Sequence, residues 1–165
     1  MEVRIELLPS KKLVGCRVMT SLNNDKTYQA WRSFMPMRKL VQRQVNSVLV
    51  SLSVYDADYF SDININSAFE KWALVEVSEY ENIPEGMETF DLPGGLYAVF
   101  DYKGSSTDTA IYYHILNEWL PASRFQLDDR PHFEILGENY RNDDSDSEEE
   151  IWIPIKQRLL YSILA

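Results

Sequence analysis

The sequence predicts an α+β fold built from two similar halves, and three observations lead to this prediction. The order strand, strand, helix, strand occurs twice along the chain, at an offset of about 84 residues. Several segments alternate apolar and polar residues with the two-residue period of a β-strand. The chain has 165 residues, a length at which one domain buries a substantial core. Together they predict a single domain with an antiparallel sheet and pseudo-two-fold symmetry.

The first copy of the pattern covers residues 1 to about 83. A helix is expected over 27–43, beginning near Asp25 or Thr27. Pro36 lies inside this helix and predicts a kink or a break. A polar loop, rich in Asp, Asn and Ser, is expected before the last strand of the copy. The strands of this copy are expected at 2–8, 12–20, 48–55 and 72–80.

The second copy covers residues 84–157 and repeats the same order. Leu8-Pro9 aligns with Leu92-Pro93 under the 84-residue shift. A helix is expected over 107–120, ended by Pro121, and an acidic, solvated turn over 143–150. The strands of this copy are expected at 87–92, 95–103, 132–137 and 150–156. One domain over 1–157 is therefore expected, with the two repeats 1–83 and 84–157 and a C-terminal tail at 158–165.

Composition excludes several classes of protein. Apolar residues make up 45% of the chain and aromatic residues 13%, which is typical of a globular domain. No run approaches the roughly 18 apolar residues of a membrane helix, and the N-terminus has no signal-peptide pattern. The single cysteine, Cys16, lies in an apolar run and is expected in the core. We therefore expect a cytoplasmic protein with no membrane association, no metal site and no cofactor.

The net charge of −10 disfavours nucleic-acid binding, because phosphate groups are neutralised by clustered Lys and Arg. The charge is uneven along the chain. Residues 1–50 contain nine Lys or Arg and three Asp or Glu, whereas the remainder contains seven and twenty-three. No direct DNA binding is expected, and a small molecule or another protein is the expected partner.

Strand alternation predicts which side chains line a cleft between the two halves. In the strand at 48–55, Val48, Val50, Leu52 and Val54 form an apolar face that is expected to pack under the helices. Ser51, Ser53 and Tyr55 would then point to the other, open face, together with Glu134. The same argument places Trp152 beside Glu134. The predicted ligand-binding residues are Glu134, Trp152, Tyr55, Trp72 and Tyr102.

Aromatic rings around one carboxylate suit a cationic or polar-aromatic ligand. The rings offer stacking and cation–π attraction, and the carboxylate offers one strong polar contact. A carboxyl group with a pKa raised by burial also serves as a general acid or base. An ordinary surface glutamate on a wet sheet face is the alternative interpretation.

The second half of the chain resembles a known family. The segments DLPGGLYAVFDYKG (91–104), LNEWLPASRFQLDDRPHFEILGENY (116–140) and EEEIWIPIK (148–156) are similar to the GyrI-like small-molecule-binding family. This family includes the effector-binding domains of AraC-type and MerR-type regulators and stand-alone gyrase-inhibitory proteins. The resemblance implies duplicated strand-helix-strand-strand modules, with an antiparallel sheet curved around a central groove and helices on its other face. The family's groove glutamate corresponds to Glu134.

Three functions follow from the resemblance. The first is a stand-alone bacterial module that captures amphipathic or cationic aromatic ligands, as in multidrug recognition. The second is a hydrolase of reactive xenobiotics such as cyclopropane-bearing toxins, with Glu134 as the catalytic residue. The third is a protein-interaction module such as a gyrase inhibitor. The segment 56–71 is long for the family; it either covers the groove or, as we expect, forms a surface insert.

Overall fold

The computed structural model describes residues 2–159, and it confirms an α+β fold with a large antiparallel sheet that does not close on itself. The described strands are β1 (Val3–Leu8), β2 (Lys11–Thr20), β3 (Leu49–Val54), β4 (Phe69–Val77), β5 (Glu88–Leu92), β6 (Gly95–Lys103), β7 (Phe125–Leu127), β8 (His132–Leu136) and β9 (Glu148–Gln157). Most of the tail predicted at 158–165 lies outside the described residues.

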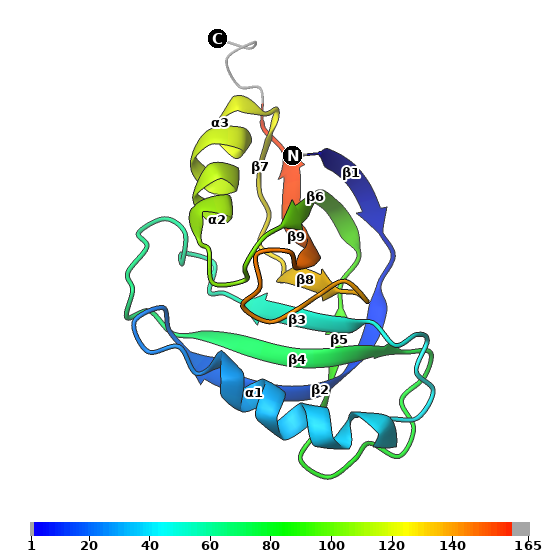
Figure 1. Cartoon of the computed structure of the whole chain (residues 1–165). Coiled ribbons are helices and arrows are strands. Elements are labelled where there is room, and N and C mark those ends of the chain that lie inside the picture. Colours follow the sequence, from blue (N-terminus) through cyan, green and yellow to red (C-terminus); the bar gives the residue numbers. More distant parts are fainter. Residues whose placement is uncertain (1, 160–165) are drawn as a thin grey trace.

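Helical segments follow the second strand of each copy (Figure 1). In the first copy, α1 (Thr27–Phe34) gives way to a 3₁₀ segment, η1 (Met35–Leu40), so the predicted break at Pro36 is confirmed and the regular helix is shorter than expected. In the second copy, α2 (Ala110–His114), the π-helical turn η2 (Ile115–Trp119) and α3 (Leu120–Ala122) follow one another. The helix therefore runs one residue past Pro121, which lies in its last turn.

The strand order β1-β6-β9-β8-β3-β4-β2-β5 displays the duplication. β3 and β8 are equivalent strands of the two copies, and they pair with each other at the centre of the sheet. Each copy also receives its outermost strand from the other copy, because β1 pairs with β6 and β5 pairs with β2. The chain thus crosses between the halves twice, which joins them into one sheet.

Equivalent positions in the two copies carry opposite charges: Arg17 corresponds to Asp101, and Arg4 corresponds to Glu88. Arg17 on β2 contacts Glu88 on β5 at 2.8 Å, whereas Arg4 on β1 contacts Asp101 on β6 at 3.0 Å. A hairpin within one copy, in the equivalent register, would bring Arg4 toward Arg17 and Glu88 toward Asp101. Like charges on facing strands are unfavourable, so the charge pattern favours the exchanged pairing.

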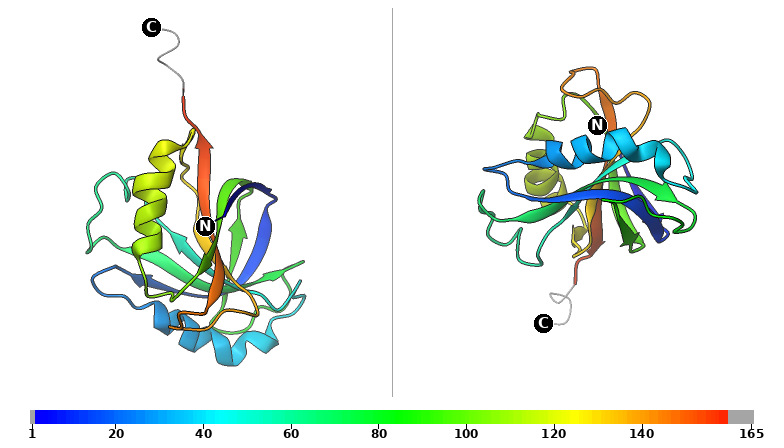
Figure 2. Two further views of the ribbon diagram at one scale, coloured as in Figure 1. Left: turned by 45° about the horizontal axis from the view of Figure 1, so that its top comes forward. Right: turned by 90° about the horizontal axis from the view of Figure 1, so that it is seen from below.

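Both faces of the sheet are buried, and the two faces differ. On the face that carries the helices, called the helix-side face, one apolar cluster packs under α1 and another packs under α2 and α3. Cys16 lies in the first of these clusters, as expected. On the opposite face, the curled sheet closes over a third cluster that includes Leu52, Tyr97 and Phe133. Figures 1 and 2 show α1 along β2 and β4, and α2 beside β9.

Candidate functional site

Glu134 lies on the helix-side face, at the seam between the two helix-covered halves. Its register partners are Ser51 on β3 and Ile151 on β9. Ser51 in turn pairs with Ala73 of the cluster under α1, and Ile151 belongs to the cluster under α2. Since Ser51 is the equivalent of Glu134 in the first copy, the seam carries one carboxylate opposite one small hydroxyl group. The site is therefore asymmetric although the fold is duplicated.

Two side chains engage the carboxylate of Glu134. The hydroxyl of Tyr112, on α2, donates a hydrogen bond to Oε1. The Nζ atom of Lys71, on β4, lies 3.6 Å from Oε2 and donates a hydrogen bond to Ser53 Oγ at 3.0 Å. The side chains of Lys71 and Glu134 are only 11% and 17% exposed. The centre of the site is thus a largely buried ion pair with a phenol attached.

Aromatic rings cover the side of this ion pair. Tyr55 follows β3 and lies 5.0 Å from the imidazole of His132, measured between ring centroids. Phe60 stacks on the same imidazole at 5.1 Å with the ring planes 17° apart. Tyr59 and Phe69 complete the group by packing on Tyr55. We call these five residues, Tyr55, Tyr59, Phe60, Phe69 and His132, the aromatic cover.

Burial sets the protonation of the groups around Glu134. Burial, together with the positive charges of Lys71 and Arg130, lowers the pKa of His132 to about 3. Burial, followed by the negative charge of Glu134, raises the pKa of Tyr112 well above its ordinary value. Burial likewise raises the pKa of Tyr55. At neutral pH the imidazole is neutral and both phenols keep their protons, so Tyr112 remains a donor to Glu134.

The predicted assignment of faces is partly wrong. Glu134, Tyr55 and Tyr102 share one face, as predicted, but this face carries the helices, whereas it was expected to be the open face away from them. Trp152 and Trp72 do not lie on it. Trp152 pairs with Phe133 and stacks on its ring at 5.2 Å, and Trp72 pairs with Leu52. Both indoles belong to the cluster on the opposite face.

The physical reason for the error is that both faces of this sheet are buried. Val50, Leu52 and Val54 pack inside the curled sheet, away from the helices, where the prediction placed them under the helices. The apolar face of a strand therefore does not show which side the helices cover. The face of Glu134, which was predicted to line an open groove, is the face that the helices cover.

The segment expected as a surface insert at 56–71 contributes to the site. Most residues from 61 to 66 are exposed, in keeping with an insert. Tyr59 and Phe60, however, turn inward; Tyr59 is only 7% exposed, and Phe60 stacks on His132. Lys71, at the end of this segment, belongs to β4 and reaches Glu134. The segment thus supplies part of the aromatic cover and the counter-ion of Glu134.

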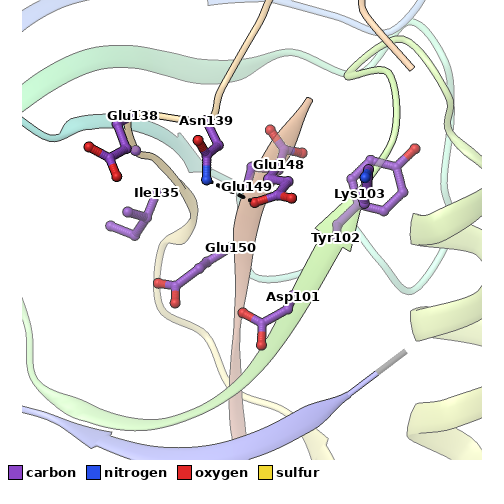
Figure 3. A pocket seen from close by; sticks show the side chains of 10 residues that line it. Asp101, Tyr102, Lys103, Ile135, Glu138, Asn139, Glu148, Glu149 and Glu150 are labelled. Atoms are coloured by element: carbon purple, nitrogen blue, oxygen red, sulfur yellow. Dashed lines mark hydrogen bonds between the residues drawn. The ribbon is translucent and has the colours of Figure 1, made fainter. Parts of the chain in front are cut away.

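An open hollow lies at the ends of β6, β8 and β9, beside the loop 137–147. Most of its strand residues, such as Ile135 and Asp101, point to the opposite face, whereas Tyr102 and Glu149 belong to the helix-side face. It has a volume of about 600 Å³ and is lined by Asp101, Tyr102, Lys103, Ile135, Gly137, Glu138, Asn139, Glu148, Glu149 and Glu150. Figure 3 shows these side chains, with carboxylates on several sides. Tyr102 and Glu149 are register partners on β6 and β9. Tyr102, one of the predicted ligand-binding residues, therefore lies at the hollow and next to a second carboxylate.

Sequence reasoning missed Lys71, Tyr112, His132 and Glu149 as members of the site. His132 was recognisable, since it lies two residues before Glu134 and alternation places both on one face. Lys71 was assigned to a loop because the strand was expected to begin at 72. Tyr112 and Glu149 reach Glu134 only through the packing of α2 and the register of β9, which no local pattern reveals.

Comparisons with known proteins identify a family and a shared fold. Residues 1–156 match the family described as the GyrI-like small molecule binding domain. The transcriptional regulator BrlR of Pseudomonas aeruginosa is 28% identical over 162 residues, which cover 94% of this chain and 56% of the regulator. The chain thus spans about half the length of this curated relative. Among the described residues, no helix is long and apolar enough to cross a membrane.

Solved structures share the fold. The structure of SAV2435 bound to tetraphenylphosphonium superposes with a TM-score of 0.69 at 17% identity, covering 94% of each chain. A hydrolase encoded by lin2189 from Listeria innocua superposes with a TM-score of 0.60 at 8% identity, covering 94% of this chain and 92% of the hydrolase. At these identities the two likenesses bear on the fold alone.

Proposed function

The chain belongs to the GyrI-like small-molecule-binding family, and we propose that it captures amphipathic, cationic aromatic ligands beside Glu134 on the helix-side face. The observation that carries the proposal is a largely buried carboxylate next to an aromatic cover. Aromatic rings attract cations through their quadrupole, and a carboxylate in a partly desolvated setting strengthens that attraction. The related protein SAV2435 has been solved with tetraphenylphosphonium, a permanent cation that carries four phenyl rings.

A thermal-shift comparison tests this proposal. Tetraphenylphosphonium is expected to raise the unfolding midpoint of the wild type, because a ligand that binds only the folded state stabilises it by about 2.7 kcal/mol at 100 times its Kd. The neutral triphenylphosphine oxide and the anionic tetraphenylborate are expected to give much smaller shifts. The Glu134→Gln variant is expected to lose most of the response, since the site then keeps the positive charge of Lys71 without its partner.

The matched control is Glu85→Gln, which removes one carboxylate from an exposed loop. This control should respond as the wild type does. Equal shifts with the cation and the anion, or an unchanged response in Glu134→Gln, would contradict the proposal.

A hydrolytic function is the second candidate, and the contact between Tyr112 and Glu134 favours it. A carboxylate held by a phenol is able to orient a water molecule toward an electrophilic carbon, such as one in a strained cyclopropane ring. The hydrolase encoded by lin2189 from Listeria innocua has a similar backbone fold. Turnover distinguishes the two functions: a hydrated product that accumulates beyond one equivalent of protein supports hydrolysis, whereas binding without product supports capture.

A further inference from the structure

The carboxylate of Glu134 is already occupied by groups of the chain itself. One oxygen accepts the hydroxyl hydrogen of Tyr112, and the other faces the ammonium of Lys71 at 3.6 Å. The ammonium is fixed further by its hydrogen bond to Ser53. Attraction between opposite charges strengthens as water is excluded, and an ammonium tethered to β4 competes without paying the association entropy of a free ligand. A ligand cation that approaches Glu134 directly must therefore displace Lys71.

Glu149 differs from Glu134 in having no such partner. Among the described residues its carboxylate makes no hydrogen bond and no ion pair, although it is partly buried. It lines the open hollow with Tyr102 and lies on β9, two residues before the register partner of Glu134. Asp101 and Glu150 at the same hollow pair with Arg4, and Glu148 accepts a hydrogen bond from Asn139. Glu149 is thus an unpaired, partly desolvated carboxylate at the rim of the hollow, beside the ring of Tyr102.

The environment of Glu149 also determines its protonation. Burial and the negative charge of Glu134 raise the pKa of Glu149, the charge of Lys71 opposes the rise, and the result is a pKa of about 7. With Lys71 and Glu134 compensating each other, the local charge is set by whether Glu149 holds a proton. A cation in the hollow would favour the ionised form and would thereby release that proton.

Building on the proposed function, we propose that Glu149 is the carboxylate that contacts the positive charge of the ligand, that Lys71 is the resident counter-ion of Glu134, and that uptake of a cation through the hollow is coupled to the release of a proton from Glu149. Glu134 then acts as a positioning residue, because it holds Lys71 and Tyr112 in place. The ligand class that fits is an aromatic monocation whose charge stays at the mouth of the site.

The sign of the pH dependence follows from the groups that face Glu149. These groups are Glu134 on β8, Lys71 on β4, Tyr112 on α2, Tyr102 on β6 and Tyr140 in the loop after β8. Burial raises the pKa of each of the three tyrosines, so they stay protonated between pH 6 and 8. His132, with its pKa of about 3, stays neutral in that range. Ionisation of Glu149 therefore strengthens cation binding as the pH rises, by about tenfold between pH 6 and pH 8.

Calorimetric titration with tetraphenylphosphonium tests the proposal, because this probe does not itself titrate. For the wild type, the Kd is expected to fall about tenfold from pH 6 to pH 8. Titrations at pH 7 in buffers of different ionisation enthalpy should show the release of about half a proton for each ligand bound. The Glu149→Gln variant should bind about 100-fold more weakly at pH 8, with no pH dependence and no proton release, while Glu85→Gln should behave as the wild type.

Two outcomes have different meanings. If the wild type binds the cation and Glu149→Gln keeps both its affinity and its pH dependence, the role assigned to Glu149 is overturned and the proposed function stands. If the wild type binds no aromatic cation at any pH from 6 to 8, the proposed function fails, and this assignment fails with it.

Discussion

Replacing Lys71 with methionine is expected to destabilise the ligand-free protein by about 3 kcal/mol and to tighten the binding of tetraphenylphosphonium by about 100-fold. Removing one member of a buried ion pair leaves the other charge without compensation, and both side chains here are largely buried. The uncompensated negative charge of Glu134 then attracts the ligand cation at the mouth of the site, and binding recovers part of that lost free energy. Methionine keeps the approximate length of the side chain, so the change acts mainly through charge.

This prediction is measured by urea unfolding and by calorimetric titration at pH 8, where a carboxyl group is least able to neutralise itself by taking up a proton. Lys39→Met, which removes an exposed lysine from η1, is the matched control and should change neither quantity by much. Weaker cation binding by Lys71→Met would show that the ammonium supports the site and does not compete with the ligand.

Replacing His132 with phenylalanine is expected to protect the fold against acid. Burial lowers the pKa of His132 to about 3, below its ordinary value of 6.5. Between pH 3 and pH 6.5, His132 is protonated in the unfolded chain but neutral in the folded chain. Protonation therefore stabilises the unfolded chain, and the folded protein loses stability as the pH falls from 6.5 toward 3. The phenylalanine of the variant has no titrating group, so it avoids this loss of stability in acid, and its ring still stacks on Phe60.

The difference in unfolding free energy between variant and wild type should therefore shift in favour of the variant by roughly 2–3 kcal/mol from pH 7.5 to pH 4. Urea unfolding at a series of pH values measures it, and other titrating groups cancel in the difference. His114, the other histidine of the chain, is 45% exposed at its side chain and provides the control His114→Phe. A constant difference across the range would mean that the imidazole of His132 is open to water.

The fold was largely predictable because its determinants are local and periodic. Alternation in the strands, Pro36 at the break in the first helix and the matched Leu-Pro pairs are visible without any knowledge of contacts. The short strand β7, which pairs with β9, carries only three residues and was missed. The exchange of β1 and β5 between the halves was not predictable either, since it depends on which distant strand each edge meets.

The site was only partly predictable. Glu134 was predicted from alternation and from the family resemblance, whereas Tyr55 was predicted from alternation alone. The placement of Trp152 beside Glu134 was wrong because the isoleucines of β9 were grouped with the apolar face of β3, whereas the sheet buries both faces and these two sets lie on opposite ones. Trp72 also lies on the face opposite to Glu134. Lys71 and Glu149 depend on the register of strands that are distant in sequence, and register is fixed by the packing of the whole sheet.

The face on which the ligand binds is tested most directly by aromatic nuclear magnetic resonance spectra of the wild type during titration with tetraphenylphosphonium. If the ligand binds beside Glu134, its phenyl protons will show contacts with the rings of Tyr102, Tyr112 and the aromatic cover, and the indole N–H signals of Trp72 and Trp152 will stay in place. Contacts with the two indoles, with the tyrosine rings unaffected, would place the ligand on the opposite face and would contradict the proposed site.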